Sequence, residues 1–523
     1  EEGGWADRTQ YAQWEHSIKD GSVEDAIYFA FHTNAAGSTC GTTARGLSTY
    51  RHSTATTAST NLQNIMHDTM YDHIESLWFP GWTVRGKNVT NFGENSQTNL
   101  GTGLPGFLIE GLFHDNQADT TGYADPRFRN DYARAIVQGV INYFEDRDGI
   151  TLTNPPETPR NLRAISTGGG NVQITWDAPL NSSNDVHFGG AATSYIVYRS
   201  SNGFGFDNGT TVASGTTLTV SGVPADAPTC FRVAAVNAGG ISFPTETLAA
   251  SDGDIKALIV NGFDRNERSL VPTQTITNAG TDLRRLDPRR FQAFNYSVEH
   301  ANSLAPLGIQ ISGSSNEAVA SGAVNLGDYD LVFWILGEES TTDETLSTAE
   351  QTAVANYLAL GDRGFFISGA EIGWDLDSQG TTGDRTFFNG TLRADYVGDD
   401  AGTYAIASTA TGPFAGISSF NFDVASGARY DAEFPDRLTT SSGSTVALTY
   451  SGGTADTAAV AYDGASRVLV FGFPFETIAS AAKRDEVMAA AVTFLLPDAP
   501  SAPSALSATT NSQTQIDLSW TDN

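Results

Sequence analysis

The stretch AIYFAFHTNAAG, residues 26–37, places a single histidine at the end of an apolar run. Residues 26–31 predict a buried strand, and His32 follows it directly. A histidine in this position is either a hydrogen-bonded structural residue, the commoner case, or a metal ligand. The second interpretation needs partners elsewhere in the chain.

The segments that follow alternate between helical and strand patterns. Residues 106–110, GFLIE, predict a second strand, and Asp125 and Pro126 occupy the N-cap and first-turn positions of a long helix. Alternating strands and helices indicate a sheet covered by helices. The apolar positions at helical spacing are Leu62, Ile65, Met66, Met70, Ile74 and Leu77 in one helix, and Tyr132, Ile136, Val137, Val140, Ile141 and Phe144 in the other.

Three ordered motifs in residues 1–150 carry a resemblance to a known family. They are FAFHTNAAG followed by RGLSTY, then PGFLIEGLFHDNQAD, then DPRFRNDYARAIVQGVINYF. Together they resemble the second half of the zinc-dependent N-acetylmuramoyl-L-alanine amidases. WADRTQYAQWEHS resembles the Arg-bearing helix that precedes the histidine strand in that family. His32 and Asn34 match its His-x-Asn motif, and Glu110, Phe113 and Asn116 match its later Glu motif.

The resemblance implies that His32 binds zinc and that Glu110 is the catalytic carboxylate. Zinc lowers the pKa of its bound water, and a neighbouring carboxylate can accept the proton and pass it to the leaving amine. The family's other two ligands, a His in a Gly-His-Gly-Gly turn and a Glu, come from an N-terminal half that this sequence does not contain. We therefore expect the remaining zinc ligands to lie outside this chain. The other histidines of the region, at positions 16, 52, 67, 73 and 114, have no i, i+4 partner and are interpreted as surface or core residues.

Composition limits the partners. The chain has 60 acidic and 29 basic residues in 523, a net charge of −31, which disfavours nucleic acid and anionic membrane surfaces. No apolar run is long enough to span a bilayer. Cys40 and Cys230 lack metal-site spacing and are interpreted as free. The protein is expected to be secreted or exposed at the cell surface.

Two proline-rich spacers, NPPETP and PDAPSAP, divide the chain into four regions. The predicted domains are 1–150, an incomplete α/β amidase-like domain; 157–251, a β-sandwich; 254–497, a doubly wound α/β domain; and 500–523, the start of a second β-sandwich. Since the first and last are incomplete, we expect a longer polypeptide, self-assembly or a neighbouring chain to complete them.

Region 157–251 resembles a fibronectin type III domain. Trp176 ends a strand in which apolar and polar residues alternate, and Tyr195 and Tyr198 lie on the next strand. The segment CFRVAAVNAGG lies in the strand before the last. Residues 500–523 repeat its P-x-x-L-x-A…W pattern, with Trp520 in the place of Trp176. Such domains imply spacing or weak binding.

Region 254–497 contains four near-continuous apolar runs, KALIVNGF, DLVFWILG, GFFISGAEIGW and RVLVFGFPFE, which predict parallel strands buried on both faces. A helix between the second and third is capped by Ser347 or Thr348 and closed by Gly361. The pattern resembles the class I glutamine amidotransferase-like fold. That family carries a nucleophilic cysteine in the turn after the third of these strands, where this chain has Ala370 and then Glu371.

Acidic residues follow several of these strands. A carboxylate cluster on that rim could bind a cation such as calcium, or a sugar; the alternative is that these are solvated loop acids. The residues are Glu338, Glu339, Glu371, Asp375, Asp377, Asp384 and Glu476.

Two function classes follow. One is a secreted peptidoglycan amidase whose other domains are spacing or targeting modules that bind peptidoglycan or another extracellular glycan. The other is a non-catalytic surface, adhesion or matrix protein with an incomplete amidase-like domain.

Overall fold

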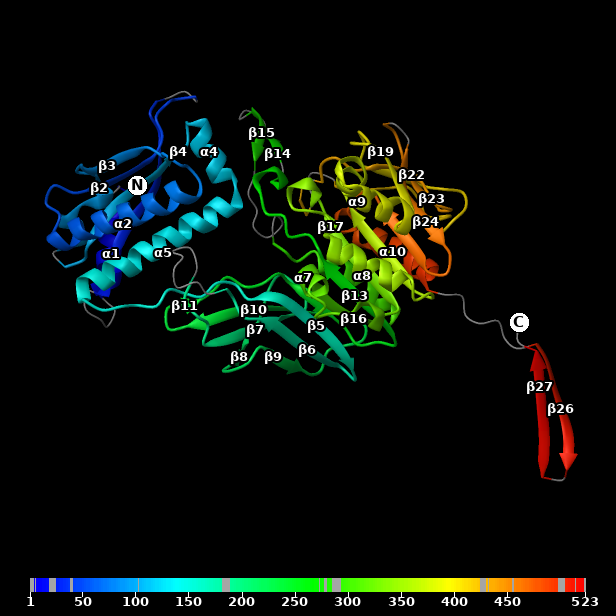
Figure 1. Ribbon diagram of the computed structural model, residues 1–523. Coiled ribbons are helices and arrows are strands. Elements are labelled where there is room, and N and C mark those ends of the chain that lie inside the picture. Colours follow the sequence, from blue (N-terminus) through cyan, green and yellow to red (C-terminus); the bar gives the residue numbers. More distant parts are fainter. Residues whose placement is uncertain are drawn as a thin grey trace.

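The structure is a computed structural model of a mixed α/β protein with several sheets (Figure 1). It describes residues 4, 6–17, 25–37, 41–101, 103–180, 189–271, 273–276, 280–284, 293–423, 429–430, 432–453, 456–496, 504–512 and 514–521. Cys40 lies outside these ranges, and Cys230 is buried and free.

The first region is a four-stranded sheet in the order β1-β4-β2-β3, with helices packed against it. β1 runs parallel to β4, and β2 runs antiparallel to β4 and parallel to β3. The strands are β1 (Tyr28–Asn34), β2 (Leu47–Arg51), β3 (Val84–Val89) and β4 (Gly106–Phe113). The helices are α1 (Asp7–Ser17), α2 (Thr57–Leu77), α3 (Gln97–Leu100), α4 (Gln117–Ala124) and α5 (Pro126–Asp148).

The predicted helices α2 and α5 are present, and Asp125 caps α5 by accepting a hydrogen bond from the Arg127 N–H. The apolar face of α5 is shifted from the prediction, because Val137 is 45% exposed while Ala135 and Tyr143 are buried. The prediction that the strand before His32 is buried was also wrong. Only Ala30 of β1 is buried, since β1 lies at the edge of the sheet and pairs with β4 alone among the described strands.

Region two is a β-sandwich of two sheets. The indole of Trp176 is buried between them, 5.2 Å from the ring of Tyr195. One sheet is formed by β5 (Arg160–Gly168), β6 (Asn171–Asp177) and β9 (Thr217–Val220). The other consists of β7 (Ser194–Ser200), β8 (Thr210–Val212), β10 (Thr229–Asn237), β11 (Gly240–Ile241) and β12 (Leu248–Ala250).

Region three contains the four predicted strands, paired in parallel. They are β13 (Ile255–Asn261), β17 (Leu331–Gly337), β18 (Gly364–Gly369) and β25 (Arg467–Phe471). A fifth parallel strand, β16 (Ile309–Ser315), pairs with the other side of β13, so the order across the sheet is β16-β13-β17-β18-β25. β16 was not predicted, because its sequence, IQISGSS, is largely polar.

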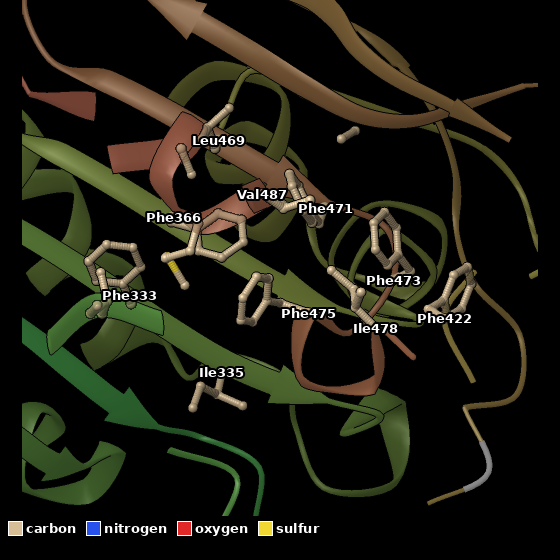
Figure 2. Packing of buried hydrophobic residues seen from close by; sticks show 14 of the residues in the cluster. Phe333, Ile335, Phe366, Phe422, Leu469, Phe471, Phe473, Phe475, Ile478 and Val487 are labelled. Atoms are coloured by element: carbon tan, nitrogen blue, oxygen red, sulfur yellow. The ribbon is translucent and has the colours of Figure 1, made fainter. Parts of the chain in front are cut away.

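Successive strand residues of region three alternate between two apolar clusters, one on each face of the sheet. One face packs against α6 (Ser297–Leu304) and α10 (Ala481–Leu495), the other against α7 (Asn316–Ala320) and α8 (Thr348–Leu358). Figure 2 shows the first cluster, in which the rings of Phe366 and Phe471 are 4.7 Å apart and Val487 of α10 lies beside them. Ser347 caps α8 with a capping box to Glu350, as expected.

Further elements extend this region. They are β14 (Thr273–Ile276), β15 (Gly280–Arg284), α9 (Thr382–Thr386), β19 (Ala394–Gly398), β20 (Ala405–Ser408), β21 (Phe420–Asn421), β22 (Arg437–Thr440), β23 (Thr445–Tyr450) and β24 (Thr457–Asp463). β24 runs antiparallel to β25, which ends the parallel part of the sheet.

Regions two and three share one continuous sheet. β5 pairs antiparallel with β16, with Ala164 opposite Gly313 and Arg163 opposite Ser314. Side chains add to the joint, since Ser312 Oγ accepts a hydrogen bond from the Ser166 N–H at 3.0 Å. By contrast, β26 (Ser504–Ser512) and β27 (Gln515–Thr521) form a separate exposed hairpin, in which Trp520 is 55% exposed (Figure 1).

Candidate active site

His32 and Glu110 lie opposite each other on the adjacent parallel strands β1 and β4. Residues paired in register project to the same face of a sheet, so both side chains face the same space. The pairing becomes irregular between His32 and Asn34, directly after this point.

A third residue, Glu94, completes the cluster. It lies in a short 3₁₀ turn (Gly93–Asn95) after β3 and is only 2% exposed. One of its carboxylate oxygens contacts His32 Nε2, and the other accepts a hydrogen bond from Arg8 of α1. Glu94 therefore lies between a histidine and an arginine that are both distant from it in the sequence.

The turn that carries Glu94 is fixed by its neighbours. Asn95 donates hydrogen bonds from Nδ2 to the Thr90 carbonyl at 2.9 Å and the Tyr50 carbonyl at 3.4 Å. Thr9 Oγ1 donates to the Gly93 carbonyl at 3.2 Å, which ties the turn to α1. The Arg-bearing helix identified by resemblance thus lies against the cluster.

Glu110 is partly buried, and its Oε2 is enclosed without a hydrogen-bond partner. Desolvation raises the pKa of Glu110, the nearby Glu94 carboxylate raises it further, and His32 acts in the opposite direction. A carboxylate with a raised pKa and an unused oxygen can accept a proton at a pH closer to neutral than an exposed glutamate can.

The other motif residues have structural roles. Asn116 caps α4 by accepting hydrogen bonds from the N–H groups of Ala118 and Asp119, and it donates to the Thr42 carbonyl at 2.8 Å. Asn34 accepts a bond from the Ala35 N–H, and Phe113 is buried in the sheet.

Two of the remaining histidines of this region, His67 and His73, are buried core residues, whereas His114 is exposed and bonds to Thr33 Oγ1 at 3.0 Å, next to His32. His67 is 2% exposed and bonds to Thr49 Oγ1, while His73 bonds to Gln138. Burial lowers the pKa of His67 to about 4, so it is neutral at physiological pH.

The turn after β18 in region three has the shape of an elbow, but at a different residue from the one expected. Glu371, not Ala370, adopts the left-handed conformation, with φ of 60°. Its carboxylate lies 3.7 Å from the Arg265 guanidinium. The strained backbone position is therefore occupied by a glutamate. Region three contains no cysteine that could occupy it.

The acids predicted on the rim of this sheet do not form one cluster. Asp375 accepts a bond from the Thr345 N–H, Asp377 from the Tyr396 N–H, and Glu476 from the Tyr430 hydroxyl. Asp384 caps α9. Among the described residues, Glu339 is the only predicted acid in a group of three close carboxylates, and its partners Asp264 and Asp343 were not predicted.

Comparison with solved structures finds local similarities. The catalytic domain of CwlV, an N-acetylmuramoyl-L-alanine amidase from Bacillus (Paenibacillus) polymyxa var. colistinus, is 25% identical over 23% of this chain and 57% of its own, with a TM-score of 0.19. An N-acetylmuramoyl-L-alanine amidase from Clostridium difficile 630 is 24% identical over 28% of this chain and 67% of its own, with a TM-score of 0.22.

The FN5 domain of Drosophila Lar is 19% identical over 19% of this chain and 99% of its own, with a TM-score of 0.15. The similarity to CwlV described above covers just over half of the length of the CwlV domain. No family model and no curated protein matches the chain. Among the described helices, none combines the length and apolar character needed to cross a membrane.

Proposed function

We propose that residues 1–150 act as part of a zinc-dependent N-acetylmuramoyl-L-alanine amidase, which hydrolyses the amide bond between N-acetylmuramic acid and L-alanine in peptidoglycan. The observation that carries the proposal is the grouping of His32, Glu94 and Glu110 at one end of the β1–β4 pair. A peptidoglycan substrate implies an extracellular or cell-wall location.

The nitrogen and oxygen atoms of this cluster are of the kinds that bind zinc in proteins. His32 Nε2 and a carboxylate oxygen of Glu94 are in contact, and catalytic zinc is commonly bound by histidine nitrogen and glutamate oxygen. Bound zinc would supply a water of lowered pKa and polarise the scissile carbonyl. His32 and Glu94 would hold the ion, and the Arg8 contact fixes the orientation of the Glu94 carboxylate.

Glu110 supplies the proton transfer in this proposal. Its carboxylate accepts a proton from the attacking water and returns it to the nitrogen of the departing L-alanine. Burial raises its pKa, which makes the Glu110 carboxylate a stronger proton acceptor than an exposed glutamate.

A specific observation keeps the second function class as the alternative. A catalytic zinc site uses three protein ligands, yet across the described part of the chain the only set of three or more candidate ligand atoms close together is in region three. A non-catalytic surface or adhesion protein would need no third ligand.

Zinc content and hydrolysis of the full chain test the proposal. We expect wild-type protein to bind about one zinc and to release amino groups of L-alanine from peptidoglycan. His32→Gln and Glu94→Gln should lose the zinc, whereas Glu110→Gln should keep it and lose activity about 100-fold or more. Glu145→Gln is the matched control, because a glutamine there can still accept the hydrogen bond of the Leu152 N–H. No zinc uptake by the wild type would instead support the non-catalytic alternative.

We propose that regions two to four are spacing or binding modules and that region three has no glutaminase activity, because Glu371 at its elbow cannot form a thioester. Glutaminase activity in the full chain that is lost in Glu371→Ala would contradict this.

A further inference from the structure

A group of three carboxylates lies at the edge of the region-three sheet. Asp264 follows β13, and Glu339 and Asp343 follow β17. One oxygen of each lies within 4.8 Å of the others. Asp264 and Asp343 are exposed, whereas Glu339 is 1% exposed.

The fold explains why these residues meet. The chain passes from β13 to β16 on one side and then to β17 on the other, so the strand order reverses between β13 and β17. In open α/β sheets, ligands bind in the crevice at such a reversal, outside the carboxyl ends of the strands.

Glu339 is an independent indication that something binds there. Its Oε1 accepts hydrogen bonds from the N–H groups of Asp264 at 2.5 Å and Arg265 at 2.8 Å, which fix the carboxylate in place. Its Oε2 is buried and has no hydrogen-bond partner. A buried carboxylate oxygen without a partner is costly, and a cation would satisfy it.

Nearby basic side chains do not neutralise the group. The Arg265 guanidinium is directed to Glu267, to the Glu338 carbonyl and to Glu371. Arg127 acts on Asp343 electrostatically, but its hydrogen bonds go to Asp125.

A further acid, Glu317 at the start of α7, lies within hydrogen-bonding reach of Asp264.

We propose that Asp264, Glu339 and Asp343 bind a calcium ion at this reversal point. Calcium takes oxygen ligands at about 2.3–2.6 Å, so the ligands of one ion lie up to about 4.6–5.2 Å apart, and three oxygens within 4.8 Å of one another can surround one such ion. Magnesium needs a tighter shell of about 2.0–2.1 Å. The site is separate from the His32 cluster and does not depend on the amidase proposal.

Calcium titration of the chelator-treated full chain tests the site. We expect Glu339→Gln and Asp343→Asn each to weaken one binding event at least tenfold relative to the wild type. Glu344→Gln, an exposed neighbour outside the triad, removes the same charge and should bind as the wild type does. Hydrogen exchange should show calcium-dependent protection of residues 262–267 and 338–345 in the wild type only.

Folding of the variants is checked separately. Glutamine at 339 keeps an oxygen for the Asp264 and Arg265 N–H groups, and Asp343 is exposed, so both variants should melt like the wild type in chelator. Equal calcium binding by the wild type and both triad variants would overturn the site, as would an equal loss in Glu344→Gln. Binding of magnesium but not calcium would overturn the calcium assignment.

Discussion

At the scale of single residues, the candidate active site combines two side chains that the sequence pattern predicts, His32 and Glu110, with one that it does not predict, Glu94. His32 and Glu110 follow apolar residues in β1 and β4, so their placement on strands could be predicted. Glu94 lies in the polar stretch NFGENS, where nothing in the local pattern separates it from a solvated loop acid. Its burial depends on α1 and β1, which approach it only in the folded chain.

Buried carboxyl groups also determine how stability depends on pH. Glu476 is fully buried and accepts a hydrogen bond from the Tyr430 hydroxyl at 2.5 Å. Desolvation raises its pKa to about 7, although the Tyr430 bond and Arg429 favour the ionised form. The folded state therefore holds this proton more tightly than the unfolded state does.

We predict that the stability of region three falls as pH rises. The contribution of Glu476 is complete below its ordinary pKa near 4.5 and is lost as pH rises through about 7, a change of about 3 kcal/mol. Glu476→Gln should flatten this dependence in denaturant unfolding measured from pH 4 to pH 9. Glu486→Gln, on the exposed side of α10, should retain it. An identical slope in wild type and Glu476→Gln would contradict the prediction.

At the scale of elements, long apolar runs predicted their strands well, because a strand buried on both faces has little choice of residue. The polar strand β16 is buried nevertheless, since β5 and β13 flank it and take up its backbone hydrogen bonds. The backbone at the end of β17 restricts which residue can occupy position 337. Gly337 has φ of 49°, and a Cβ there would lie 2.1 Å from the ring of Phe263.

We therefore predict that Gly337→Ala destabilises the protein by about 2–4 kcal/mol, the sum of left-handed strain and overpacking. Gly322→Ala separates the left-handed strain from the overpacking, because Gly322 has φ of 76° but open space around it. This substitution should lower the free energy of unfolding by only about 1–2 kcal/mol. Chemical denaturation of both variants provides the comparison. Equal losses would show that the Phe263 contact does not matter.

At the scale of the whole molecule, regions two and three share one sheet. The β5–β16 pairing carries the sandwich sheet into the α/β sheet, and Gln310 Nε2 donates to the Ser166 carbonyl and hydroxyl across the joint. Ser251, between the two regions, donates from Oγ to the Ile309 carbonyl at 2.9 Å. The boundary predicted near residues 251–254 therefore runs through a shared sheet.

We predict that residues 157–497 unfold in a single calorimetric transition of the full chain. Gln310→Ala removes the hydrogen bonds to Ser166 and should lower the unfolding free energy of β6 and β17 equally, by about 1 kcal/mol in hydrogen exchange. Gln173→Ala, exposed on β6, should leave both unchanged. Separate transitions, or a loss confined to one region, would show that the two regions unfold independently.

The sequence by itself determined the two long helices of region one, the four apolar strands of region three, the chain order of the regions, and the placement of His32 and Glu110 on strands. Those features depend on local periodicity, capping residues and turn chemistry, which a short window of sequence contains. The tertiary structure alone decided that Glu94 contacts His32, that Asp264 meets Glu339 and Asp343, and that β5 joins β16. These contacts connect residues that are distant in the chain, and they form only when burial of the surrounding apolar faces brings the elements that carry them together.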